Sequence, residues 1–151
     1  MTILDDQIRK LVNQSCLYLD DADWPNYLGL YTTEFTYRIV CYSPELRKDM
    51  VWMEQDRKGM TNLVNNLENH ITRQGRFMHQ VQIAAINPQG AFSETISPFL
   101  VVYTDLEGVT TIFAAGRYID VIDTTSNKPL ISNRKVVLDT RDLGSGSHFP
   151  I

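Results

Sequence analysis

The chain has 151 residues, a formal net charge of −4 and 43% hydrophobic residues, enough apolar material for the core of one domain. Its acidic balance, without a basic cluster, argues against nucleic acid as a partner, because backbone phosphates are bound mainly by Lys and Arg. Apolar runs such as Phe99–Tyr103 are far shorter than the ~20 residues of a membrane-spanning helix, and the acidic start is not typical of a signal peptide. We therefore expect a single domain over residues 1–151 in the cytoplasm, with no membrane contact.

The first half of the chain has the pattern of helices around one strand. Apolar residues at helical spacing predict an amphipathic helix over residues 4–19, and the acidic stretch Asp20–Asp23 ends it and offers caps for a second, short helix beginning near Trp24. The period then changes to two over residues 35–42, which predicts a strand. After an irregular segment, a third helix is predicted over residues 56–71, with its first residue as the cap.

The second half of the chain is rich in strand-forming residues and turn signals. It predicts four consecutive strands joined by short turns, over residues 77–86, 91–104, 109–122 and 130–140. Together the two halves predict an α+β fold, in which three N-terminal helices pack on one face of a strongly curved, mostly antiparallel sheet. The glycine- and serine-rich stretch at 143–151 is expected to be either frayed or docked on something else.

The residues that bind metals most often are few. The two cysteines, Cys16 and Cys41, lack the close spacing of zinc or iron–sulfur ligands, and we interpret them as buried thiols in a reducing compartment. A mononuclear iron site with two histidines and a carboxylate would have to draw on His70, His79 and His148 alone. No metal site is predicted, and neither is a phosphate-binding loop or a nucleophile elbow.

Acid–base chemistry is the one kind of catalysis for which the sequence offers candidates. His79 on an inner strand, with Asp20 or Asp23 from the first two helices, could abstract a proton from a carbonyl compound bound in a pocket. Alternatively, His79 is structural, bonded to a backbone carbonyl or lying at a subunit contact, and Arg76 pairs with an acidic neighbour. The residues favour the structural alternative without excluding the other.

Three stretches, in this order and spacing, resemble the small (β) subunit of aromatic-ring-hydroxylating dioxygenases. They are Asp23–Val40, Arg76–Val81, which is similar to that family's Arg-x-x-His strand start, and Asn133–Leu143, which has a basic pair before Val-Val-Leu-Asp. The resemblance spans nearly the whole chain and implies an NTF2-like cone fold. The chain is short for the family and looks closer to the compact small subunits paired with oxygenases that act on aromatic acids.

The resemblance also implies a division of labour between subunits. The Rieske [2Fe–2S] cluster and the mononuclear iron of these enzymes belong to the large (α) subunit, so no cofactor and no catalytic residue are expected in this chain. Its implied role is mainly structural support of an α subunit in the breakdown of aromatic compounds, as a homotrimer or within an α3β3 hexamer. Arg76, His79, Arg117 and Arg134 are then candidates for the subunit interface. The alternative is a stand-alone NTF2-like isomerase, dehydratase or small-molecule-binding protein that uses His79 as its acid or base.

Overall fold

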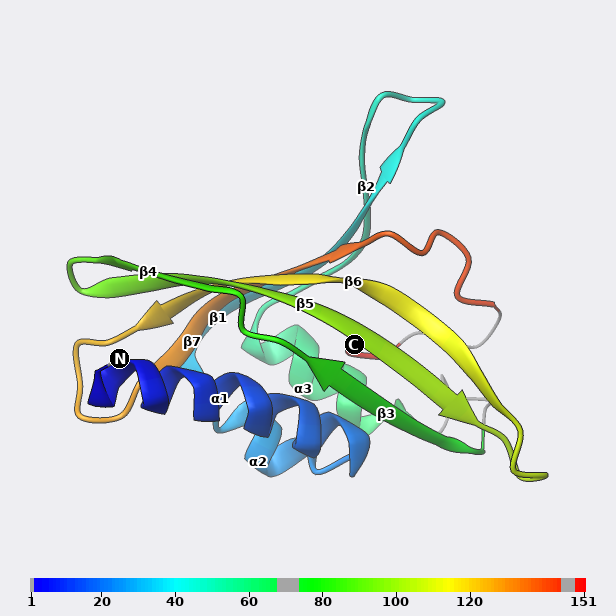
Figure 1. Cartoon of the computed structure of the whole chain (residues 1–151), viewed down its shortest axis with the longest axis horizontal. Helices are drawn as coiled ribbons and strands as arrows, with labels where there is room; N and C mark the ends of the chain where they lie inside the picture. The colour runs from blue at the N-terminus through cyan, green and yellow to red at the C-terminus, as the bar shows by residue number, and fades with distance from the viewer. Residues whose placement is uncertain (1, 68–73, 145–148) are drawn as a thin grey trace.

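A computed structural model describes residues 2–67, 74–144 and 149–151, and in these ranges it contains three helices and one seven-stranded sheet. The helices lie together on one side of the curved sheet (Figure 1). The α+β class predicted from the sequence is confirmed. The elements are α1 (Ile3–Asp20), α2 (Trp24–Leu28), β1 (Tyr31–Ser43), β2 (Lys48–Gln55), α3 (Arg57–Asn65), β3 (Arg76–Val81), β4 (Ala85–Gln89), β5 (Phe92–Thr104), β6 (Thr110–Asp123) and β7 (Leu130–Leu138).

The strands follow the order β2-β1-β7-β6-β5-β3, and β4 pairs with the other half of β5. Every pairing is antiparallel except that of β1 with β7, which is parallel. The predicted meander is therefore confirmed, but the strand predicted over 77–86 is two strands, β3 and β4. The ladder of hydrogen bonds is interrupted opposite Pro98. The Pro98 carbonyl accepts a hydrogen bond from the Gln82 N–H at 3.0 Å, but proline has no backbone N–H to donate in return.

Strand β2 was not predicted from the sequence. Among the described strands it pairs with β1 alone, and the β1–β2 hairpin extends away from the rest of the molecule (Figure 1). Three successive apolar residues, Met50, Val51 and Trp52, are 44%, 51% and 38% exposed. Because residues 48–52 are all exposed, this part of the strand lacks the alternation of apolar and polar residues that marks a half-buried strand.

The helices begin where the local sequence provides caps. Thr2 and Asp5 form a capping box at the start of α1, and the predicted cap Asp56 accepts a bond from the Gly59 N–H at 2.8 Å. Helix α3 ends at Asn65, earlier than the predicted end at residue 71. Most of the rest of the predicted helix lies outside the described residues. Helix α1 buries one apolar face, as its periodicity predicts: Ile8, Leu11, Val12, Cys16 and Leu19.

The last described residues, 149–151, are docked on the helix side of the sheet (Figure 1). Of the two alternatives for the tail, frayed or docked, these residues are docked. Phe149 is 7% exposed and packs its ring 5.2 Å from that of Phe77 and 5.9 Å from that of Phe113. Ile151 is 1% exposed, and its backbone N–H donates to the Tyr37 hydroxyl at 2.8 Å. This segment therefore completes the core.

Buried tyrosines predict that the fold is sensitive to alkali. Burial raises the pKa of Tyr31, Tyr37 and Tyr118 well above the ordinary value of 10.0. A group whose pKa is raised in the folded state stabilises the fold fully below its unfolded pKa and loses that contribution as the pH rises further. We expect the free energy of unfolding, measured with denaturant, to fall steeply above about pH 10. Tyr118→Phe should make the fall shallower, whereas Tyr42→Phe, at a position 52% exposed, should leave it unchanged.

Candidate functional site

His79 on β3 and Asp20 at the end of α1 form a buried pair. The His79 Nδ1 lies 2.6 Å from the Asp20 Oδ1, and the backbone N–H of His79 donates to both carboxylate oxygens at 3.1 and 3.0 Å. The two side chains are 4% and 9% exposed. Of the two carboxylates considered from the sequence, Asp20 is the partner of His79. Asp23 instead caps α2, where its carboxylate accepts bonds from the N–H and the side-chain amide of Asn26 at 3.4 and 2.7 Å.

The His79–Asp20 pair lines a cavity of about 250 Å³ with largely apolar and aromatic walls, which include Leu19, Trp24, Phe77, Phe149 and Pro150. With Nδ1 bonded to the carboxylate, the His79 Nε2 is the ring nitrogen left to accept a proton, and it has no hydrogen-bond partner among the described residues. The arrangement thus has the two parts of an acid–base pair. It equally ties the end of α1 to β3, which is a structural function that needs no substrate.

Arg76 and Arg117 lie on the surface. The Arg76 guanidinium is 70% exposed and forms an ion pair with Asp21 at 3.1 Å, as the structural interpretation of this stretch expected. Arg117 is exposed on β6. Both side chains are accessible to another subunit, and their assignment to a subunit interface stays a prediction. The ring of His79 is buried inside its own chain, so it can affect an interface only through the segments it holds.

The prediction that Arg134 lies at the subunit interface is corrected by its burial. The side chain has no exposed surface in this chain and cannot contact a partner directly. Its Nε and Nη2 donate to the two carboxylate oxygens of Asp120 at 2.8 and 2.9 Å, and its Nη1 donates to the Ser15 hydroxyl at 3.0 Å. The guanidinium also lies 4.1 Å from the centre of the Tyr118 ring. Burial alone lowers the pKa of Arg134, but the adjacent Asp120 carboxylate, together with Tyr31 and Tyr27, outweighs this, and the pKa is raised. Arg134 is therefore a charged residue of the core.

The two thiols are free and buried, as predicted. Burial raises the pKa of Cys16 to about 11, so its thiolate is strongly disfavoured at neutral pH. Within residues 2–67, 74–144 and 149–151, no three His, Cys, Asp or Glu side chains are grouped so that they could hold a metal ion, while His70 and His148 lie outside these ranges. None of the helices in the described part of the chain is long and apolar enough to span a membrane.

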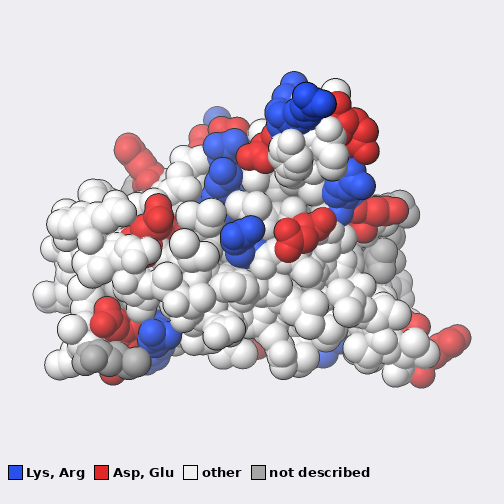
Figure 2. Space-filling view, turned by 45° about the horizontal axis from the view of Figure 1, so that its top comes forward, with Lys and Arg blue, Asp and Glu red and all other residues white. Residues whose placement is uncertain are grey.

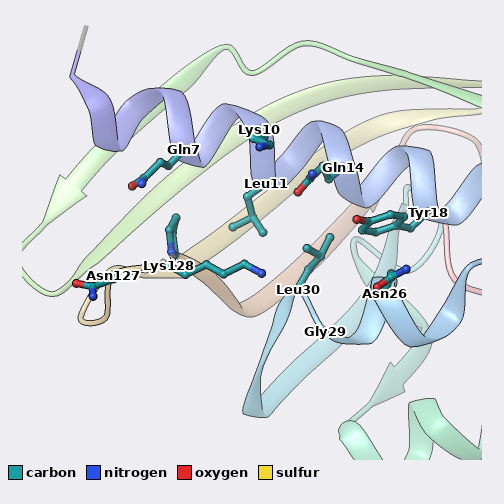
Figure 3. Close-up of a pocket in the computed structure, with 11 residues that line it drawn as sticks. Gln7, Lys10, Leu11, Gln14, Tyr18, Asn26, Gly29, Leu30, Asn127 and Lys128 are labelled. Atoms are coloured by element: carbon teal, nitrogen blue, oxygen red, sulfur yellow. The ribbon is translucent and has the colours of Figure 1, made fainter.

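A larger cavity, of about 470 Å³, lies on the other side of α1, between this helix, the end of α2 and the β6–β7 loop (Figure 3). Lys10, Gln14 and Tyr18 line it from α1, and Asn127 and Lys128 line it from the loop. The sequence did not indicate this cavity, because its residues come from three separate segments and follow no motif.

Known proteins resemble this chain over nearly its whole length. A family model described as "Ring hydroxylating beta subunit" matches residues 14–145. The β subunit of 2-aminobenzenesulfonate 2,3-dioxygenase from an Alcaligenes species is 29% identical over 134 residues, which cover 88% of this chain and 89% of the relative. The hydroxylase β subunit of methanesulfonate monooxygenase from Methylosulfonomonas methylovora is 28% identical over 156 residues, covering 97% of this chain and 86% of the relative.

The fold is shared with solved structures as well. The crystal structure of a β subunit assigned to an aromatic-ring-hydroxylating dioxygenase of Novosphingobium aromaticivorans superimposes with a TM-score of 0.85 at 21% identity, over 99% of this chain and 97% of that chain. This likeness confirms the NTF2-like fold implied by the sequence motifs. The family model covers most of the chain, and the chain therefore belongs to the family of ring-hydroxylating dioxygenase β subunits.

Proposed function

We propose that this chain is the small subunit of a multicomponent oxygenase and supports an α subunit, which holds the Rieske cluster and the mononuclear iron. The observation that carries the proposal is the family match over residues 14–145. Both relatives described above are β subunits of oxygenases, and from them we extend to this chain the oxygenase class and the need for an α subunit. An aromatic substrate and a homotrimer or α3β3 hexamer are parts of the same proposal, as are one domain over residues 1–151 and a location in the cytoplasm.

The His79–Asp20 pair fits this role as a structural contact. It joins the end of α1 to β3 through three hydrogen bonds, two of them from one backbone N–H. The stand-alone isomerase or dehydratase remains the second reading of the same pair, but the family match supports the subunit over it. On the proposed function, the isolated chain has no oxygenase, isomerase or dehydratase activity of its own.

The outer side of the sheet is the surface we assign to subunit contacts. Figure 2 shows Lys, Arg, Asp and Glu most densely in the upper part of the view, with broad uncharged areas below them. On the β1–β2 hairpin, the side chains of Tyr42, Met50 and Val51 are 52%, 44% and 51% exposed. The outer part of this hairpin buries little against its own chain, and a partner would cover its apolar side chains.

Co-expression with a candidate α subunit tests the proposed function. The gene to choose is a neighbouring reading frame that encodes the Cys-x-His and Cys-x-x-His spacing of a Rieske site. We expect a stable complex that co-purifies and light scattering that reports three copies of each chain. Val51→Lys on the hairpin should weaken assembly at least about fivefold, because it places a charge in an apolar contact.

Leu106→Lys is the matched control for that variant. Leu106 is 77% exposed in the turn between β5 and β6, away from the hairpin, so its replacement should leave assembly unchanged. Failure of the two native chains to associate, together with proton-abstraction activity in the isolated small chain, would favour the stand-alone enzyme instead.

A further inference from the structure

The cavity between α1, α2 and the β6–β7 loop has a lining suited to a negative charge. Two lysines, Lys10 and Lys128, face it together with the side-chain amides of Gln7, Gln14, Asn26 and Asn127, and none of the described carboxylates lines it. Neither lysine has an ion-pair partner in the described part of the chain. Asp6 lies one helical turn before Lys10 but forms no ion pair with it. In a chain with a net charge of −4, two unpaired lysines at one cavity are a local excess of positive charge.

The rest of the lining is apolar and comes from ordered elements. Leu11 of α1 and Leu30 before β1 are 4% exposed, and Pro129 is also buried. Figure 3 shows the Lys128 side chain extending from the β6–β7 loop beneath α1 toward Leu30. The Asn26 side chain is held by its 2.7 Å bond to the Asp23 carboxylate, so one amide of the rim has a fixed orientation. An apolar floor therefore lies under a rim of N–H donors and ammonium groups.

We propose that this cavity binds a small organic anion, whose carboxylate or sulfonate group lies between Lys10 and Lys128 and whose apolar body lies on Leu11 and Leu30. Ammonium groups and amide N–H groups stabilise an oxyanion, and the apolar floor favours a ring or an alkyl chain over a bare inorganic ion. The volume of about 470 Å³ is within the usual range for small-molecule sites. This site is separate from the His79–Asp20 cavity and does not depend on the proposed function.

Benzenesulfonate is the probe for this site, and benzenesulfonamide is its uncharged counterpart of nearly the same shape. We expect benzenesulfonate to shift the NMR signals of the Asn26 and Asn127 side-chain amides in a saturable way. Calorimetry on the same chain should show binding of benzenesulfonamide about tenfold weaker, because two partly solvated charge contacts are lost. Added salt should weaken the binding of benzenesulfonate only.

Substitutions of the two lysines connect the binding to the cavity. Lys10→Gln and Lys128→Gln should each weaken benzenesulfonate binding about threefold, and the double variant about tenfold. Both side chains are exposed, so thermal unfolding should stay unchanged. Lys58→Gln is the control, since Lys58 is an exposed lysine of α3 that does not line the cavity, and it should bind as the native chain does.

Three results would overturn the proposal. One is the absence of saturable shifts at millimolar benzenesulfonate, and another is equal binding of the two probes. The third is a double lysine variant that binds benzenesulfonate normally. The native chain could fail to bind benzenesulfonate while the double lysine variant fails to assemble with the α subunit. That pair of results would show that the cavity receives an acidic side chain of the partner instead.

Discussion

Replacing Arg134 with Met is expected to lower the free energy of unfolding by about 3–5 kcal/mol, which makes it the most damaging of the substitutions considered. Arg134 and Asp120 are both 0% exposed, and the guanidinium donates to both carboxylate oxygens. Without Arg134, the Asp120 carboxylate remains in the core with no counter-charge, and the Ser15 hydroxyl loses its donor. Urea denaturation at neutral pH measures the effect.

Two further variants separate the loss of a charge pair from the loss of a large side chain. The double variant Arg134→Met with Asp120→Leu should recover at least half of the lost stability, because it removes the uncompensated charge as well. Arg117→Met, on an exposed position of β6, should change stability by no more than about 0.5 kcal/mol. A cost below about 1 kcal/mol for Arg134→Met would show that the buried pair is not needed for the fold.

His79→Ala is expected to destabilise the isolated chain by about 2–5 kcal/mol and to reduce co-purification with an α subunit. The substitution removes the 2.6 Å contact to Asp20 and leaves that carboxylate, 9% exposed, with only the backbone N–H as a donor. The end of α1 is then held less firmly against β3. Thermal unfolding of the isolated chain and pull-down by a tagged α subunit measure the two effects.

Arg76→Ala distinguishes a direct interface contact from an effect of the fold. Its ion pair with Asp21 is 70% and 60% exposed, so its loss should cost the isolated chain no more than about 1 kcal/mol. If Arg76 contacts the partner, this variant weakens assembly while its own stability stays close to native.

A general base at position 79 predicts the reverse for His79→Ala, namely normal folding and assembly with the loss of a measurable isomerase or dehydratase rate.

The sequence predicted the elements that bury one face and missed those that do not. Helix α1 and strands β5, β6 and β7 alternate between buried and exposed residues with the period of their element, so their positions follow from local pattern. Residues 48–52 of strand β2 are all exposed and have no such pattern. The break between β3 and β4 depends on Pro98 in a neighbouring strand, which no property of residues 77–86 could indicate.

The candidate site was predicted as far as residue types allow. His79 and Asp20 were both named, but the choice between Asp20 and Asp23 depends on which turn of α1 meets β3, and this is a tertiary property. Arg134 was predicted as an interface candidate from the family resemblance, but arginine is also found buried where it is paired. Its partner Asp120 lies directly opposite on β6, so the pair became visible only when the register of β6 with β7 was known.

The parallel pairing of β1 with β7 has a consequence for how the chain folds during synthesis. Strand β1 is made early, but its neighbour in the sheet is the last strand of the chain, with Val40 beside Val137. Contacts between residues so far apart in sequence form slowly, because a long loop must close before any contact compensates for the lost chain entropy. Until β7 has left the ribosome, β1 has an unpaired edge and the apolar face of α1 has no complete sheet to cover it. Folding of this sheet is therefore completed only once β7 has emerged, and a chain that still lacks β7 is the form most exposed to aggregation.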